Sequence, residues 1–232
     1  MKCVIHGSGG VGGYYGGCLA RAGHEVFFIA RGAHLEAIQQ QGLSIKSAKG
    51  DFRIETPKSG ERCDPNFDPD LVIVAVKSWQ LPEITEEIKN YCTPSTLILP
   101  LQNGADASDI LADTLGPERV LGGLTKIFSK IEAPGVINHF TGATYIGFGE
   151  YFQDPQFQNA PDSLSERCRN LEKELDSTPG IDAEAFVDIQ KELWRKMLIF
   201  VSTSGVGTIT RTPNGVFRSI PETREMLIQL IR

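Results

Sequence analysis

Lys2-Cys3-Val4-Ile5-His6 runs directly into Gly7-Ser8-Gly9-Gly10-Val11-Gly12 at the start of the sequence. The first five residues form a short apolar run with β-branched side chains, which is typical of a buried strand. A segment of helical length follows the glycines and runs to Gly23. Strand, glycine-rich turn and helix in this order indicate a turn that binds the pyrophosphate of a dinucleotide.

Each glycine has a distinct role in such a turn. Gly7 permits the tight turn, Gly9 lets the backbone approach a phosphate, and Gly12 lets the helix pack closely on the strand. The unpaired N–H groups of the helix N-terminus then face the phosphates. The alternative is a tight turn with a purely structural role. The residues predicted to bind cofactor here are Gly7, Ser8, Gly9, Gly10, Val11 and Gly12.

A second strand is predicted from Glu25 to Ala30, and it ends at Arg31. NAD sites usually carry Asp or Glu about 20 residues past the glycines, where the carboxylate accepts from the ribose 2′-OH. No acidic residue ends this strand, and arginine suits a 2′-phosphate, so the sequence favours NADP(H). The alternative for Arg31 is an exposed charge at the start of a helix.

Composition excludes several classes of protein. The 232 residues carry a net charge of −6, and no basic cluster indicates a nucleic-acid surface. The five cysteines show no spacing typical of disulfides or of a metal site, so reduced thiols are expected. No basic leader and no run of about 18 apolar residues indicates export or membrane insertion, so a cytoplasmic protein is expected.

Further along the chain, strands and helices alternate. Gly32–Gln41 is predicted to be a helix, 42–46 and 51–55 a hairpin, and 70–76 a strand buried on both faces. A helix is then expected to about Tyr91, and a strand at 96–99 ends at Gln102-Asn103-Gly104. The pattern predicts an α/β fold with a Rossmann-like doubly wound sheet.

The pattern changes after Val120. An antiparallel extension is predicted to Gly149, then a loop from Phe152 to Ser165, a helix at 165–175 and a strand at 183–187. From Asp188 the apolar spacing is helical, with a break at 212–215 and a last helix that opens at Ile220. We therefore predict a nucleotide-binding domain at 1–187 and the start of an all-helical domain at 188–232. No helix-stop signal precedes Arg232, so further helices are expected.

Several motifs occur together in a fixed order across nearly the whole chain. They are Gly7-Ser8-Gly9-Gly10-Val11-Gly12, Lys77-Ser78-Trp79-Gln80, Gln102-Asn103-Gly104, Gly122-Gly123 with Pro134-Gly135-Val136-Ile137-Asn138-His139, Glu192-Leu193-Trp194-Arg195-Lys196, and Thr212-Pro213-Asn214-Gly215. In this order the sequence resembles the ketopantoate reductase (2-dehydropantoate 2-reductase) family.

The resemblance implies reduction of a 2-keto acid, most notably 2-dehydropantoate in pantothenate biosynthesis, by NADPH. The substrate would lie in a cleft between a Rossmann domain and a helical domain. Lys77 and Asn103 match residues that line the nicotinamide side, and Asn103 also contacts substrate. Without the resemblance, they would be an exposed lysine and a turn asparagine.

Lys196 matches the family's proton donor. Reduction of a ketone leaves charge on oxygen, and a lysine can donate a proton there or stabilise the charge. The alternative is an exposed ion pair with Glu192, four residues earlier.

The sequence departs from the family in two respects. Phe200 and Ser204 stand where better-known members carry substrate-binding asparagines, so a more apolar pocket is expected, with Ser204 retained as a substrate contact. The helices that carry a family serine and glutamate match no stretch here, so self-association through exposed helix faces is expected. A related dehydrogenase with another small substrate, and a non-catalytic NADP-binding module, remain alternatives.

Overall fold

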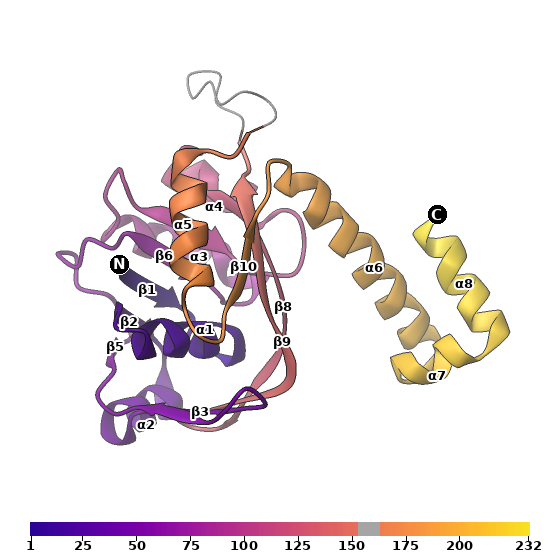
Figure 1. Ribbon diagram of the computed structural model, residues 1–232, viewed down its shortest axis with the longest axis horizontal. Helices are drawn as coiled ribbons and strands as arrows, with labels where there is room; N and C mark the ends of the chain where they lie inside the picture. Colours follow the sequence, from indigo (N-terminus) through magenta and orange to yellow (C-terminus); the bar gives the residue numbers. More distant parts are fainter. Residues whose placement is uncertain (153–162) are drawn as a thin grey trace. The chain divides into compact units, whose positions relative to one another are not determined.

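The computed structural model describes residues 1–152 and 163–232, which form two compact units (Figure 1). One unit comprises Met1–Ile189 and the other Gln190–Arg232. Most of the loop expected between Phe152 and Ser165 lies outside the described residues. Within the two described ranges, no helix is long and apolar enough to cross a membrane.

A five-stranded parallel sheet forms the centre of the larger unit. Its order is β5-β2-β1-β6-β7, the order of a Rossmann sheet. The strands are β1 (Lys2–His6), β2 (Glu25–Ile29), β5 (Lys58–Gly60), β6 (Leu71–Val74) and β7 (Leu97–Pro100). The predicted doubly wound α/β fold is confirmed, whereas the short edge strand β5 was not predicted.

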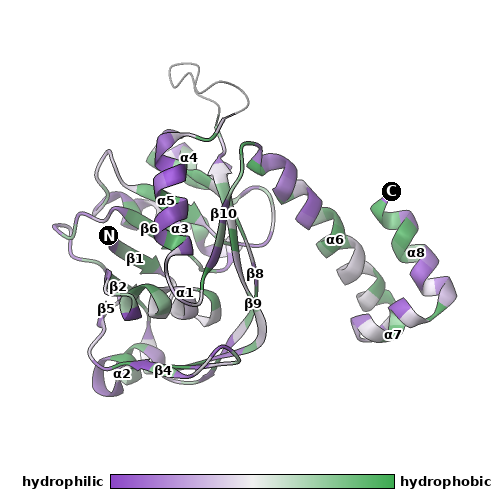
Figure 2. Cartoon of the chain, in the orientation of Figure 1, coloured by the Kyte–Doolittle hydropathy of each residue, from purple (hydrophilic) through white to green (hydrophobic). Residues whose placement is uncertain are grey.

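The central strands of the sheet are buried on both faces, because their inner residues are apolar. In β1, Cys3 and Ile5 belong to one core cluster, and Val4 between them belongs to another on the opposite face. Figure 2 shows hydrophobic colour in the middle of this strand. Each face therefore needs its own cover, which the helices and a second sheet provide.

The second sheet is mixed, with the order β10-β9-β3-β4 and β8 paired to β9. Its strands are β3 (Leu43–Ser47), β4 (Phe52–Ile54), β8 (Leu121–Ala133), β9 (Val136–Glu150) and β10 (Asp182–Ala185). The predicted hairpin is present. The antiparallel strands predicted to extend the parallel sheet are also present, as β8 and β9 of this second sheet. The sequence did not predict that β3 would pair in parallel with β9, because nothing local encodes this contact.

Helices cover the two faces of the parallel sheet. They are α1 (Gly10–Arg21), α2 (Gly32–Gln41), α3 (Leu81–Lys89) after the 3₁₀ turn Ser78–Gln80, α4 (Ala107–Leu115) and α5 (Glu166–Asp176). Helix α1 packs against strands of both sheets, and Tyr15 fixes it there through a 2.6 Å hydrogen bond to Thr125 of β8. Helix α4 was not predicted.

Helix α5 is held to β9 by a half-buried ion pair. Arg167 Nε donates to Glu150 Oε1 at 2.7 Å, and Ser165, the N-cap of α5, donates to the same oxygen at 2.5 Å. Burial raises the pKa of Glu150, but the bonds from Arg167 and Ser165 outweigh it and leave the pKa below its usual value.

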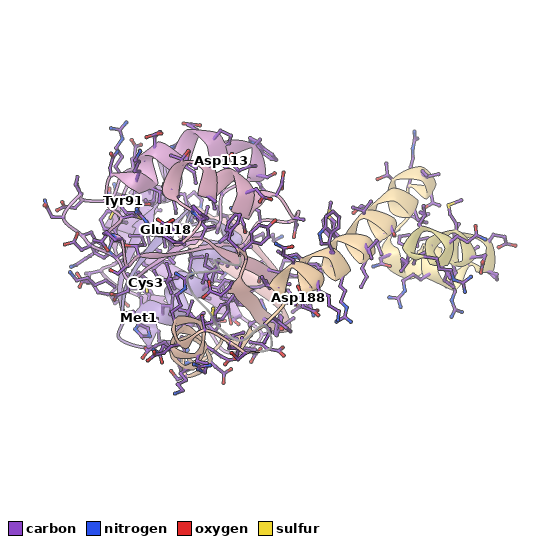
Figure 3. The ribbon with its side chains drawn as sticks, turned by 90° about the horizontal axis from the view of Figure 1, so that it is seen from above. Met1, Cys3, Tyr91, Asp113, Glu118 and Asp188 are labelled. Carbon is purple, nitrogen blue, oxygen red and sulfur yellow. The ribbon has the colours of Figure 1, made fainter. Side chains whose placement is uncertain are left out.

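The smaller unit consists of helices. They are most of α6 (Ile189–Thr210), α7 (Asn214–Ser219) and α8 (Pro221–Ile231). Asp188, labelled in Figure 3, comes just before α6, whose first turns are hydrophilic (Figure 2). A small core of Val206, Phe217 and Leu227 joins the helices. The break near Pro213 and the last helix were predicted, whereas α7 was not.

Candidate functional site

The predicted cofactor residues of the larger unit gather at one edge of the parallel sheet. Arg31 follows β2, the glycine turn follows β1, Lys77 follows β6 and Asn103 follows β7. These strands are adjacent and parallel, so their carboxyl ends share one edge (Figure 1). The turn after β1 lies where the strand order reverses, the usual ligand position in such sheets.

The glycine turn is held by close backbone packing. Gly7 has φ +102°, and a Cβ there would lie 2.8 Å from the backbone nitrogen of Val76. A Cβ at Gly12 would lie 2.3 Å from the carbonyl oxygen of Gly7. Neither position tolerates a side chain, because the atoms that it would meet are backbone.

Gly9 differs from the other glycines of the turn. Apart from Gly9 and its chain neighbours, no atom of the described residues lies within 4 Å of the point where its Cβ would be. Protein packing therefore does not explain this glycine, whereas a ligand that approaches the backbone would. The neighbouring Ser8 side chain is buried, and its hydroxyl oxygen has no hydrogen-bond partner in the described part of the chain. Both observations fit a dinucleotide pyrophosphate at this turn.

Arg31 is the N-cap residue of α2, and its side chain is 54% exposed. Its guanidinium lies 3.7 Å from the carboxylate of Glu83, which is 68% exposed and belongs to α3. The contact between Arg31 and Glu83 was not predicted from the sequence, because it joins two elements that are distant in the chain. An arginine and a carboxylate therefore lie together just after the carboxyl end of β2.

Lys77 and Asn103 are both exposed, at the ends of β6 and β7. Gln102, buried next to Asn103, donates from Nε2 to the carbonyl oxygens of Val74 and Val76, each at 3.1 Å. This side chain fixes the backbone that leads to Lys77. Gln102 was part of a recognised motif, but the sequence did not reveal this role.

Two histidines next to the turn were not singled out from the sequence. His6, at the end of β1, is buried and hydrogen-bonds Tyr91 at 2.9 Å; Tyr91 is labelled in Figure 3. Burial, together with the charge of Arg31, lowers the pKa of His6 to about 4, so the ring is neutral at pH 7. His34 of α2 contacts the carbonyl oxygen of Ser8 at 2.9 Å. No local pattern marks His34, because its partner Ser8 belongs to another element.

Lys196, Phe200 and Ser204 lie on α6, in the smaller unit. Their spacing of four residues puts them on one face of the helix. Lys196 is half-buried, and Phe200 and Ser204 are exposed. Glu192, the alternative partner of Lys196, accepts a 2.6 Å hydrogen bond from Arg195.

A parallel sheet of this order, with a glycine turn at its switch point, defines a doubly wound α/β protein of the Rossmann type. The model of the ketopantoate reductase family PanE/ApbA matches residues 3–151. The chain therefore belongs to this family of oxidoreductases.

Individual relatives agree with this assignment. The chain is 33% identical over 219 residues to an uncharacterized oxidoreductase, YkpB, of Bacillus subtilis, covering 93% of this chain and 67% of that protein. It is 27% identical to the 2-dehydropantoate 2-reductase of Geobacter metallireducens, with a TM-score of 0.85 over 98% of this chain and 71% of that one.

The fold is also shared with an enzyme of another name. D-mandelate dehydrogenase in complex with NADH and anilino(oxo)acetate is 22% identical, with a TM-score of 0.85 over 98% of this chain and 70% of that chain. At this identity the likeness concerns the fold alone.

Proposed function

We propose that the protein reduces a 2-keto acid to a 2-hydroxy acid with NADPH, and that 2-dehydropantoate is the leading substrate. The observation that carries the proposal is the glycine turn, where Gly9 is open and Ser8 has a buried hydroxyl without a partner among the described residues. Membership of the ketopantoate reductase family supports the reaction class.

The larger unit provides the groups that would hold the cofactor. The first N–H groups of α1 have no intrahelical acceptors and would bind the pyrophosphate. Arg31 would bind the 2′-phosphate, while Lys77 and Asn103 would lie beside the nicotinamide. NADPH, when bound, supplies the hydride that reduces the carbonyl carbon.

Lys196 would supply the proton. As the carbonyl carbon is reduced, charge develops on its oxygen, and the ammonium of Lys196 donates a proton to that oxygen to complete the hydroxyl. The resulting neutral amine regains a proton from water. Ser204, on the same face of α6, would donate to or accept from the polar end of the substrate.

These roles assign one function to each part of the chain. Residues 1–187 would be the NADP-binding domain, and residues 188–232 would contribute the proton donor. Cofactor binding therefore needs only the larger unit, whereas turnover needs both.

The first experiment is a titration of the 232-residue chain with NADPH. 2-Dehydropantoate is then added, and the absorbance of the reduced cofactor is recorded over time. Saturable binding and then substrate-dependent oxidation are the expected results. Absence of NADPH binding would contradict the proposal. Binding without turnover of any keto acid would instead favour a non-catalytic NADP-binding module.

Cofactor preference is tested by Arg31→Asp. The substitution removes the cation proposed for the 2′-phosphate and introduces a carboxylate that can accept from a 2′-OH. We expect the ratio of NADPH to NADH affinity to fall and NADH to become preferred. An unchanged ratio would show that another group binds the 2′-phosphate.

A second candidate is a related dehydrogenase with a more apolar keto acid as substrate. Phe200 favours it, because this exposed aromatic lies one helical turn from Lys196. A panel of 2-keto acids with aliphatic, hydroxylated and aromatic side chains separates the two candidates. Higher kcat/KM for aromatic substrates than for 2-dehydropantoate would favour the second.

A further inference from the structure

His34 forms two hydrogen bonds that fix which ring nitrogen donates and which accepts. Its Nε2 lies 2.9 Å from the carbonyl oxygen of Ser8, and the backbone N–H of Gly135 donates to its Nδ1 at 3.0 Å. A carbonyl oxygen only accepts and a backbone N–H only donates. Nε2 is therefore the donor to Ser8, and Nδ1 is the acceptor from Gly135.

The two contacts join three parts of the larger unit. His34 belongs to α2, Ser8 to the glycine turn, and Gly135 to the turn between β8 and β9. Gly135 is itself fixed, because its carbonyl oxygen accepts from the N–H of Ser44 at 2.9 Å. The imidazole is therefore anchored on one side and restrains the glycine turn on the other.

The restraint acts on one peptide group. It is the Ser8–Gly9 peptide, whose carbonyl oxygen accepts from His34. The preceding peptide is held separately, because the N–H of Ser8 donates to the carbonyl oxygen of Ile29 at 2.9 Å. The Ser8–Gly9 peptide is trans, so the N–H of Gly9 points away from His34. Gly9 has no side chain to resist rotation of this peptide, so an external hydrogen bond is needed to hold its orientation.

We propose that His34 is a positioning residue for cofactor binding, which orients the Ser8–Gly9 peptide so that the N–H of Gly9 faces the pyrophosphate. The inference rests on the proposed function, since it requires a dinucleotide at this turn. His34 acts through Ser8 and does not contact the cofactor itself.

Three substitutions separate the two hydrogen bonds. His34→Gln places an amide N–H near the position of Nε2 and keeps the bond to Ser8. His34→Asn places an oxygen near the position of Nδ1 and keeps only the bond to Gly135. His34→Ala removes both, and His24→Ala, which changes a histidine at the opposite end of β2, is the matched control.

The readouts are the dissociation constants of NADPH and of adenosine 2′-phosphate, which lacks a pyrophosphate. We expect the Ala and Asn variants to bind NADPH roughly 3- to 10-fold more weakly, as loss of one positioning hydrogen bond predicts. The Gln variant and the His24 control should stay within about twofold of the wild type. Affinity for adenosine 2′-phosphate should not change in any variant.

Any of three results would overturn the inference while the wild type still binds NADPH. One is an unchanged NADPH affinity in His34→Ala. The others are an equal loss for Gln, Asn and Ala, and a parallel loss for both ligands, as a general structural role predicts. A wild-type chain that binds no NADPH would instead overturn the proposed function and this inference with it.

Discussion

The strand-end site of the larger unit and the Lys196 face of α6 are built in different ways. At the strand ends, buried Gln102 donates to backbone carbonyl oxygens, and buried His6 is hydrogen-bonded to Tyr91. The glycines let neighbouring backbone segments pack closely against one another. On α6, large apolar side chains around Lys196 are exposed, among them Trp194 and Phe200. The residues at the strand ends are held in place by contacts within the larger unit. The side chains around Lys196 have few buried neighbours within the described smaller unit.

This difference suggests that cofactor binding and turnover depend on separate parts of the chain. Substitutions at the strand ends should change NADPH affinity, and substitutions on α6 should change turnover. The four predictions below test that separation, in order of decreasing expected effect.

The largest effect is expected for Lys196→Ala. Loss of the proton donor should lower kcat by roughly 10²- to 10⁴-fold. The dissociation constant of NADPH should remain nearly that of the wild type, because the groups proposed to hold the cofactor lie in the other unit. Steady-state kinetics and a fluorescence titration measure the two quantities. Equal activity in the variant would exclude Lys196 as the acid, and Arg195→Ala is the matched control on the same helix.

Gly12→Ala and Gly9→Ala should separate stability from binding at the glycine turn. The new Cβ at position 12 meets the oxygen of Gly7, so we expect Tm to fall by roughly 2–10 °C and NADPH binding to weaken with it. At position 9 there is open space, so Tm should be retained while NADPH affinity falls about 10-fold or more. Normal NADPH affinity in Gly9→Ala would argue against a pyrophosphate at this turn.

His6 should make the larger unit less stable in mild acid. Its pKa is about 4 in the folded chain, because the ring is buried near Arg31, against an ordinary value of 6.5. Between these values the unfolded chain binds a proton that the folded chain does not, so stability is complete above pH 6.5 and falls as the pH drops toward 4.

The loss between pH 7 and pH 5 should reach up to about 2 kcal/mol in the wild type. It should be smaller in His6→Asn, which keeps an acceptor for Tyr91 but does not titrate. Urea unfolding of both proteins, followed by circular dichroism at each pH, measures the loss. Identical pH dependence in both proteins would exclude His6 as the cause.

The smallest effect is expected for Glu83→Gln. Because Glu83 pairs with Arg31 and would repel a 2′-phosphate, its neutralisation should tighten NADPH binding by about two- to fivefold. NADH affinity should not change, and Glu86→Gln on the same helix is the control. Tighter binding of both cofactors would point to a general charge effect.

The sequence predicted those features that are encoded within short segments. The glycine turn, the buried strand before Lys77 and the alternation of strands and helices depend on local patterns, and all of them are present. The pairing of β3 with β9 and the contact of Arg31 with Glu83 could not be predicted, because they join residues far apart in the chain. His34 was missed for the same reason, since its partners Ser8 and Gly135 come from different elements.

The position of α1 between two sheets also bears on how the chain reaches its native state. Five of the twelve residues of α1 are glycines, so this segment has little tendency to form a helix before its neighbours are in place. The strands that pack against α1 pair only when residues far apart in the sequence come together. For example, Ser47 contacts His139, which lies 92 residues later in the chain. Such long-range closure is slow. We therefore expect α1 to gain hydrogen-exchange protection late in refolding, so that dinucleotide-binding capacity appears only with the last folding phase.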